Sequence, residues 1–153
     1  MMSVRRFLVT FDSLPIDKPS VKSGQNSAEV VTACRCVNVG LFISGDLRRD
    51  VMVSLGIGGP DDMRVISFPG KSLKRVSPDE RSISFFLLKA VEKINNLESG
   101  ESFTMDNGIE LERSSLDQLI KYWDQEVLHV PSTHPERFIL DSNLNADKAE
   151  SES

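Results

Sequence analysis

The sequence predicts an α/β fold in which a mostly parallel sheet is covered by helices on both faces. Short apolar runs such as Arg5–Phe11 and Val51–Ile57 have the length and composition of buried strands. Between them lie segments whose apolar residues recur at three- and four-residue steps, which is typical of helices that pack one side against a sheet. Strands that alternate with helices along a chain indicate an α/β sheet.

The expected strands are delimited by turn residues. The turn Gly58-Gly59-Pro60-Asp61-Asp62 separates two of them and indicates a hairpin. The stretch that contains Pro15, Pro19 and Gly24 is expected to be a loop, and so is Gly100–Asn107. The predicted strands are Arg5–Phe11, Val51–Ile57, Arg64–Phe68, Gly108–Leu111, Val127–Val130 and Arg137–Leu140.

Three helices are expected. The first begins at Ala28, carries Val30, Ala33, Val37 and Leu41 on one side, and has Gly45 as its stop signal. For the second helix, Ser77 is the expected N-cap, Pro78 suits the first position, and Glu80 completes a capping box. Its apolar stripe runs through Ile83, Phe86, Leu87, Ala90, Ile94 and Leu97. A short third helix is expected over Ser115–Trp123.

The composition is that of one folded domain. The chain has 153 residues, of which 39% are hydrophobic and 27% charged. We expect a folded domain over residues 1–140 and a disordered acidic tail over residues 141–153. No apolar run is long enough to cross a bilayer and no export signal is visible, so a cytoplasmic protein is expected. Cys34 and Cys36 are expected to be buried thiols on a helix rather than a disulfide or a metal site.

Charge is distributed unevenly along the chain, whose net charge is −5. Residues 1–90 hold 13 Lys and Arg against 9 Asp and Glu, whereas residues 91–153 hold 5 against 14. An RNA-binding surface, if present, therefore belongs to the first part. Arg48 and Arg49 precede a strand, and Arg75 and Arg81 surround the start of the long helix, where free backbone N–H groups favour phosphate. The alternative is that these arginines form ion pairs or are simply solvated.

Catalytic motifs of general type are absent from the sequence, which contains no glycine-rich nucleotide loop, no zinc-protease motif and no nucleophile elbow. We therefore assign no catalytic residue.

Several segments together resemble the archaeal tRNA pseudouridine-N1-methyltransferases. The resemblance covers roughly residues 4–140, and it is strong to about residue 97 and weak after that. The most specific segment is Ser77-Pro78-Asp79-Glu80-Arg81, within Ser72–Ser82. The other matching segments are Arg5–Val9, Cys34–Asn38, Leu41–Ser44 and Leu47–Val51.

The resemblance implies a SPOUT fold, in which the C-terminal chain threads a trefoil knot that binds S-adenosylmethionine. It implies a homodimer that methylates N1 of a pseudouridine, at position 54 in the T-loop of tRNA, with no DNA or membrane partner. On this basis Leu128 and Asp141 are the expected cofactor-binding residues. The expected RNA-binding residues are Arg35, Arg48, Arg49, Arg75 and Arg81.

Two departures from the family pattern qualify this expectation. Ala28-Glu29-Val30-Val31 stands where the family has Gly-Arg-Leu-Asp, and Asp141 replaces a glycine beside the cofactor. The family also continues to a third loop and a last helix where this sequence has its acidic segment, so we expect an incomplete knot region and weak cofactor binding or none. The alternatives are a catalytically inactive RNA-binding or dimerising module, and a truncated product without a function of its own.

Overall fold

A computed structural model of the chain describes residues 4–43, 45–123 and 126–133. Its centre is a six-stranded sheet with the strand order β6-β7-β5-β4-β1-β8, and a separate two-stranded hairpin follows the second helix. The sheet contains β1 (Arg5–Phe11), β4 (Val51–Ile57), β5 (Met63–Pro69), β6 (Ser102–Thr104), β7 (Glu110–Ser114) and β8 (Glu126–Pro131). The hairpin pairs β2 (Phe42–Ile43) with β3 (Asp46–Leu47).

The directions of the strands confirm the predicted α/β sheet. β1 is parallel to both β4 and β8, whereas β4–β5, β5–β7 and β7–β6 are antiparallel neighbours. It follows that β1, β4, β7 and β8 run in one direction and that β5 and β6 run in the other. β4–β5 and β6–β7 are antiparallel because short connections such as the Gly58–Asp62 turn reverse the chain, as the hairpin prediction required for β4 and β5.

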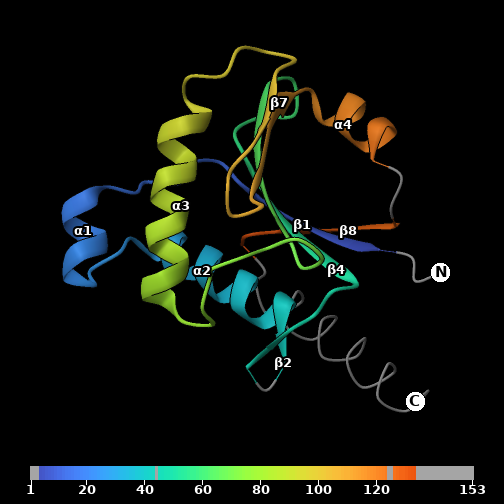
Figure 1. The fold of residues 1–153 in the computed structure, drawn as a ribbon. Coiled ribbons are helices and arrows are strands. Elements are labelled where there is room, and N and C mark those ends of the chain that lie inside the picture. Colours follow the sequence, from blue (N-terminus) through green and yellow to red (C-terminus); the bar gives the residue numbers. More distant parts are fainter. Residues whose placement is uncertain (1–3, 44, 124–125, 134–153) are drawn as a thin grey trace, which may run out of the picture.

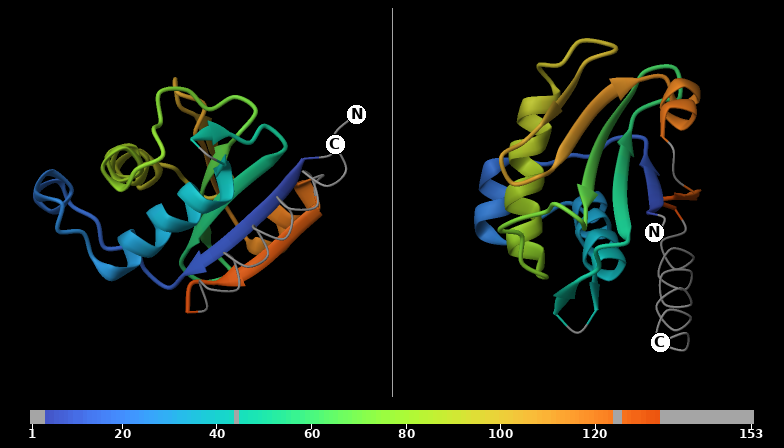
Figure 2. Two further views of the ribbon diagram at one scale, coloured as in Figure 1. Left: turned by 90° about the horizontal axis from the view of Figure 1, so that it is seen from below. Right: turned by 45° about the vertical axis from the view of Figure 1, so that its right-hand side comes forward.

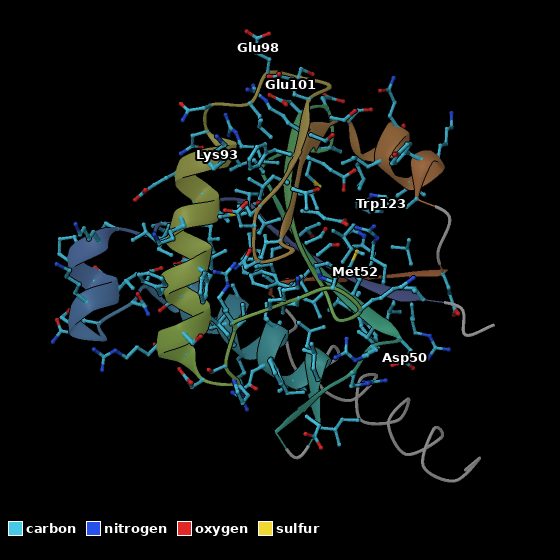
Figure 3. The ribbon with its side chains drawn as sticks, viewed as in Figure 1. Asp50, Met52, Lys93, Glu98, Glu101 and Trp123 are labelled. Atoms are coloured by element: carbon cyan, nitrogen blue, oxygen red, sulfur yellow. The ribbon has the colours of Figure 1, made fainter. Side chains whose placement is uncertain are left out.

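Helices cover both faces of the sheet (Figures 1 and 2). α2 (Ala28–Leu41) and α3 (Glu80–Ile94) pack on one face, and α1 (Lys18–Ser23) lies against α3 on its outer side. α4 (Leu116–Tyr122) lies on the opposite face. Figure 3 shows Trp123 where α4 ends and Met52 on β4, lower in that view. None of the helices among the described residues combines the length and the apolar character needed to span a membrane.

Side-chain alternation along β1 divides the core between these two faces. Phe7, Val9 and Phe11 point into the larger cluster under α2 and α3. Leu8 points to the other face, where it packs with Met63, Val65, Leu119 and Trp123. The burial of β1 on both faces explains why its sequence reads as a continuous apolar run.

Two predicted helix boundaries are wrong. The first helix ends at Leu41 rather than near Gly45, because Phe42 and Ile43 are extended and pair with β3. The N-cap of α3 is Asp79 rather than Ser77, and its carboxylate accepts a hydrogen bond of 2.8 Å from Ser82 N. A carboxylate caps as well as a hydroxyl, and it gains further from the positive end of the helix dipole.

Two elements lie in segments that were predicted to be loops. α1 carries local helix signals, with Asp17 as N-cap and Gly24 at φ 74° as C-cap, but it buries only Val21 and so lacks an apolar stripe. All three residues of β6 are exposed, so β6 has no alternating pattern and is defined by its pairing with β7. The predicted strand Arg137–Leu140 and the predicted tail over residues 141–153 lie outside the described residues.

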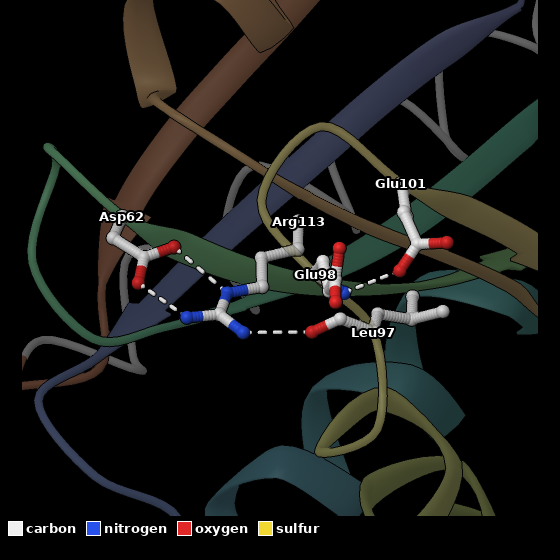
Figure 4. Close-up of polar contacts among 5 residues, drawn as sticks. All are labelled: Asp62, Leu97, Glu98, Glu101 and Arg113. Atoms are coloured by element: carbon white, nitrogen blue, oxygen red, sulfur yellow. Dashed lines mark hydrogen bonds and ion pairs between the residues drawn. The ribbon is translucent and has the colours of Figure 1, made fainter.

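One ion pair ties two connections to strand β7 (Figure 4). The Arg113 guanidinium donates to both carboxylate oxygens of Asp62, at 3.0 and 2.9 Å, and its Nη1 donates to the carbonyl of Leu97 at 2.7 Å. These hydrogen bonds from Arg113 hold the pKa of Asp62 below its usual value. The turn between β4 and β5 is thereby tied to β7 and to the chain that leaves α3. In the same view, the carboxylate of Glu101 accepts a hydrogen bond from the backbone N–H of Glu98.

Gly70 is the tightest backbone approach in the fold. Its N–H donates to Val51 O at 2.9 Å, and a Cβ at this position would lie 1.8 Å from the carbonyl oxygen of Arg48. We expect Gly70→Ala to lower the free energy of unfolding by about 1–3 kcal/mol, because neither backbone can yield without breaking strand pairing. Urea denaturation of the two proteins measures this difference in the free energy of unfolding. Gly59→Ala is the matched control, since nothing lies within 4 Å of its Cβ, and a comparable loss there would contradict the steric explanation.

Candidate functional site

The carboxyl ends of the parallel strands β1 and β8 form one candidate site, because ligands of α/β sheets bind at this edge. Here Thr10 Oγ1 and His129 Nε2 lie 2.9 Å apart, and Ser132 N donates to Thr10 O at 2.9 Å. β8 is an edge strand of the described sheet, so half of its backbone N–H and C=O groups point away from β1. The carboxyl ends therefore offer a polar side-chain pair, and the outer side of β8 offers backbone groups that have no strand partner among the described residues.

The two predicted cofactor residues are placed differently. Leu128 is paired with Phe7 across the β1–β8 ladder, and its half-buried side chain packs against the core under α2. A contact between residue 128 and a ligand at the sheet edge would therefore use its backbone. Asp141 lies outside the described residues.

Arg48 and Arg49 have opposite environments although they are adjacent. Only 9% of the Arg48 surface is exposed, its Nε lies 3.9 Å from Asp50, and its buried Nη1 finds no hydrogen-bond partner among the described residues. Burial lowers the pKa of the Arg48 guanidinium. Arg49 is exposed and donates to Lys71 O at 3.1 Å. Arg49 is thus the side chain of this pair that a phosphate can reach directly.

The other predicted RNA-binding residues, Arg35, Arg75 and Arg81, are exposed. Arg75 and Arg81 flank the start of α3, and Arg75 is held at φ 68°. No carboxylate among the described residues lies within 4.0 Å of the guanidinium groups of Arg35, Arg49, Arg75 or Arg81. The ion-pair alternative for these four arginines therefore has no support in the described part of the chain.

A cavity on the other face of the sheet was not predicted from the sequence. It has a volume of about 930 Å³, and it lies on the α4 side of the sheet, between that helix and the β6–β7 hairpin. Its floor is Arg6, which is only 3% exposed and donates through Nη1 to Ser54 Oγ at 2.7 Å and to Ser67 Oγ at 3.1 Å. The guanidinium carbon of Arg6 lies 3.9 Å from the centroid of the Trp123 ring.

Carboxylates balance the buried charge of Arg6. Glu112 accepts from Trp123 Nε1 at 3.1 and 3.3 Å, so the tryptophan contacts the arginine through its face and the glutamate through its edge. Burial lowers the pKa of Arg6 to about 10, against the opposing effect of Glu112 and Glu110. Burial likewise raises the pKa of Glu110, which Arg6 opposes. Arg6 therefore stays charged at neutral pH.

One sequence signal could have indicated this network. Ser54 stands in an otherwise apolar strand, Ser67 follows Val65 and Ile66 in the next one, and the structure pairs the two serines directly with their hydroxyls 2.7 Å apart. Arg6 stands just before the apolar run Phe7–Val9 of β1. Polar residues on the same face of adjacent strands are expected to find one another.

Known proteins resemble this chain over most of its length. Residues 5–130 match a family described as "Putative SAM-dependent RNA methyltransferase". The chain belongs to this family. The match spans every element of the main sheet, from β1 into β8, and it includes the parallel β1–β8 edge and the Arg6 network.

Archaeal relatives of this methyltransferase family carry the name tRNA (pseudouridine(54)-N(1))-methyltransferase. The protein of Methanococcus maripaludis C6 is 48% identical over 69 residues, which are 44% of this chain and 35% of that protein. The Haloferax volcanii protein is 37% identical over 94 residues, 59% and 45% of the two chains. The Methanocorpusculum labreanum protein is 32% identical over 131 residues, 78% and 66% of the two chains. The first of these matches thus spans about a third of the relative's length.

The cysteines of α2 are buried and free. In the described part of the chain, no three His, Cys, Asp or Glu side chains gather where they could hold a metal ion. Burial raises the pKa of the Cys34 and Cys36 thiols to about 12 each, from an ordinary value of 9.0. The native state therefore favours the protonated, unreactive form of both groups.

We expect neither thiol to react with a thiol-specific reagent at pH 8 until the protein unfolds, whereas both should react at once in urea. The raised pKa values also make the free energy of unfolding depend on pH. The stabilisation that comes from keeping both thiols protonated is complete below about pH 9 and declines as the pH rises from 9 towards 12. Rapid labelling of the native protein would show that α2 opens locally.

Trp123 offers a direct test of the Arg6 network, and it is the only tryptophan in the chain. Trp123→Phe keeps an aromatic ring over Arg6 but removes the N–H that donates to Glu112. We therefore expect the free energy of unfolding to fall by about 1.5–3 kcal/mol, which is the range for a hydrogen bond to a charged group. Urea denaturation followed by circular dichroism measures it. Tyr122→Phe is the control, because Tyr122 is 81% exposed and should tolerate the change within about 0.5 kcal/mol.

Proposed function

We propose that this chain acts in S-adenosylmethionine-dependent methylation of tRNA, at N1 of a pseudouridine at position 54. The observation that carries the proposal is the family match over residues 5–130, together with relatives that bear that name. The fold supports it, because β1 and β8 place a polar edge where α/β proteins bind small ligands. We further propose a cytoplasmic homodimer, on the resemblance of residues 4–140 to the SPOUT methyltransferases.

The described residues fit one wall of a cofactor site. A nucleoside cofactor needs backbone hydrogen-bond groups, and the outer edge of β8 offers backbone groups that have no strand partner among the described residues. The backbone of residue 128 and the Thr10–His129 pair would hold the cofactor there, with Asp141 as a further proposed contact. When bound, S-adenosylmethionine supplies a methyl group that is already activated for transfer.

The chain's own contribution would be to hold the nucleotide in position. Transfer requires the uracil N1 in line with the activated methyl group, and fixing that geometry is a large part of the rate enhancement. The exposed guanidinium groups of Arg35, Arg49, Arg75 and Arg81 would hold phosphates, since arginine binds them with two parallel hydrogen bonds. Arg48 would contribute indirectly, because its backbone N–H bonds to Leu41 O and its carbonyl packs against Gly70, which fixes the loop before Arg49.

The purified chain should bind S-adenosylmethionine in a calorimetric titration and transfer a labelled methyl group to tRNA that contains pseudouridine at position 54. The matched control is the same tRNA with uridine at that position, in which N1 carries the ribose and cannot accept a methyl group. Transfer to both substrates would contradict the assignment of N1 as the target. Binding of tRNA that falls steeply with salt, without cofactor binding or transfer, would instead indicate the non-catalytic RNA-binding module.

A further inference from the structure

The outward face of α3 carries an aromatic side chain where a polar one is expected. Phe85 is 46% exposed, and Phe103 on the neighbouring strand β6 is 42% exposed. A lysine lies over each ring: Lys89 Nζ is 5.0 Å from the Phe85 centroid, and Lys93 Nζ is 4.4 Å from the Phe103 centroid. Single exposed apolar residues are common in proteins, but two rings that each pair with a cation on one surface form a specific arrangement.

These residues form a continuous ridge. Arg81, Phe85, Lys89 and Lys93 are spaced four residues apart along α3, opposite the side that buries Ile83, Leu87, Ala90 and Ile94. Figure 3 shows Lys93 at the end of α3 that leads to the loop with Glu98 and Glu101. We call Arg81, Phe85, Lys89, Lys93 and Phe103 the α3 ridge. From Phe85 to Lys93 the helix rises by about 12 Å.

At its start the α3 ridge borders a groove between α1 and α3. The groove has a volume of about 370 Å³ and is lined by Val21, Lys22, Asp79, Arg81, Ser82 and Phe85. The carboxylate of Asp79 is engaged as the helix cap, which leaves Lys22 and Arg81 as the free charges of the groove beside the Phe85 ring. Of the other acids on α3, Glu80 accepts a hydrogen bond from Asn26, and Glu92 is exposed.

We propose that the α3 ridge binds unpaired nucleotides of RNA, with bases stacked on Phe85 and Phe103 and phosphates bound by Lys89, Lys93, Arg81 and Lys22. Alternating aromatic and cationic side chains are the chemistry by which proteins hold single-stranded nucleic acid, since every base has a face that can stack. The inference rests on the proposed RNA substrate and adds a contact surface to it. α3 packs on β5 and β7, so the ridge is separate from the Thr10–His129 edge on β1 and β8.

The test is fluorescence anisotropy of a labelled single-stranded RNA, titrated with the full chain and its variants. Phe85→Leu with Phe103→Leu keeps apolar side chains but removes the stacking faces, and we expect binding to weaken about tenfold or more. Lys89→Gln with Lys93→Gln should lower the slope of log K against log salt by about 1.4, as expected for two lost phosphate contacts. Tyr122→Leu with Lys121→Gln, an exposed aromatic–lysine pair on α4, is the matched control.

The outcomes separate this inference from the proposed function. Ridge variants that keep their folded circular dichroism spectrum and bind RNA like the unaltered chain would overturn the ridge but leave methylation intact. An unaltered chain that binds no RNA would refute both the ridge and the RNA substrate. Titration with the cofactor tests only the proposed cofactor site. A chain that binds no cofactor but still binds RNA through the ridge would therefore contradict the methylation proposal and not the ridge. If the α4 control variant lost as much RNA affinity as the ridge variants, the effect would be a general one of charge and apolar surface, and the ridge proposal would also be overturned.

Discussion

The parallel pairing of β1 with both β4 and β8 is the constraint on which the rest of this structure depends. β8 follows β1 by more than a hundred residues, yet it pairs with β1 from Arg5↔Glu126 to Thr10↔Pro131. The pairing brings Thr10 and His129 together at one edge. It also brings β8 beside the strand that carries Arg6, and Trp123, which lies shortly before β8 in the sequence, contacts Arg6. The candidate cofactor edge is thus a consequence of this strand placement.

Arg6 shows how a buried charge can organise a sheet face. Its guanidinium would be costly to bury alone, and the structure surrounds it with two hydroxyls, an aromatic face and nearby carboxylates. These partners come from β4, β5, β7 and the end of α4, so one side chain ties together four elements that are distant in sequence. Trp123 is the last residue before the segment that leads into β8. The network therefore fixes Trp123, three residues before the strand on which the proposed cofactor contacts lie.

The proposed RNA contacts and the proposed cofactor contacts occupy different parts of the molecule. The exposed arginines and the α3 ridge lie in helices and loops on or near the α2–α3 side, where the chain is basic, while the Thr10–His129 pair lies at the sheet edge. Such a division suits a reaction in which a cofactor supplies the reactive group and the protein positions a large polyanion. Arg48 belongs to neither group. Its side chain is buried, and its backbone N–H bonds to Leu41 O, so Arg48 holds the loop from which the exposed side chain of Arg49 extends.

The sequence by itself determined the order of α2, α3, α4 and five of the six strands of the main sheet, the β4–β5 hairpin and the basic character of the first part, since periodicity, turn residues and charge are local properties. It also carried the family resemblance that the match over residues 5–130 confirms. Only the tertiary structure decided that β1 lies between β4 and β8. It also decided that Ser54, Ser67 and Trp123 surround Arg6. The difference in exposure between the adjacent residues Arg48 and Arg49 likewise depends on the tertiary structure. α1, β6 and the β2–β3 hairpin were missed. α1 and β6 have no apolar pattern, since one is defined by its caps and the other by its partner strand, and β2 and β3 have only two residues each. Contacts between residues 48 to 119 positions apart leave no periodic signal along a chain, and burial is set by what packs from elsewhere.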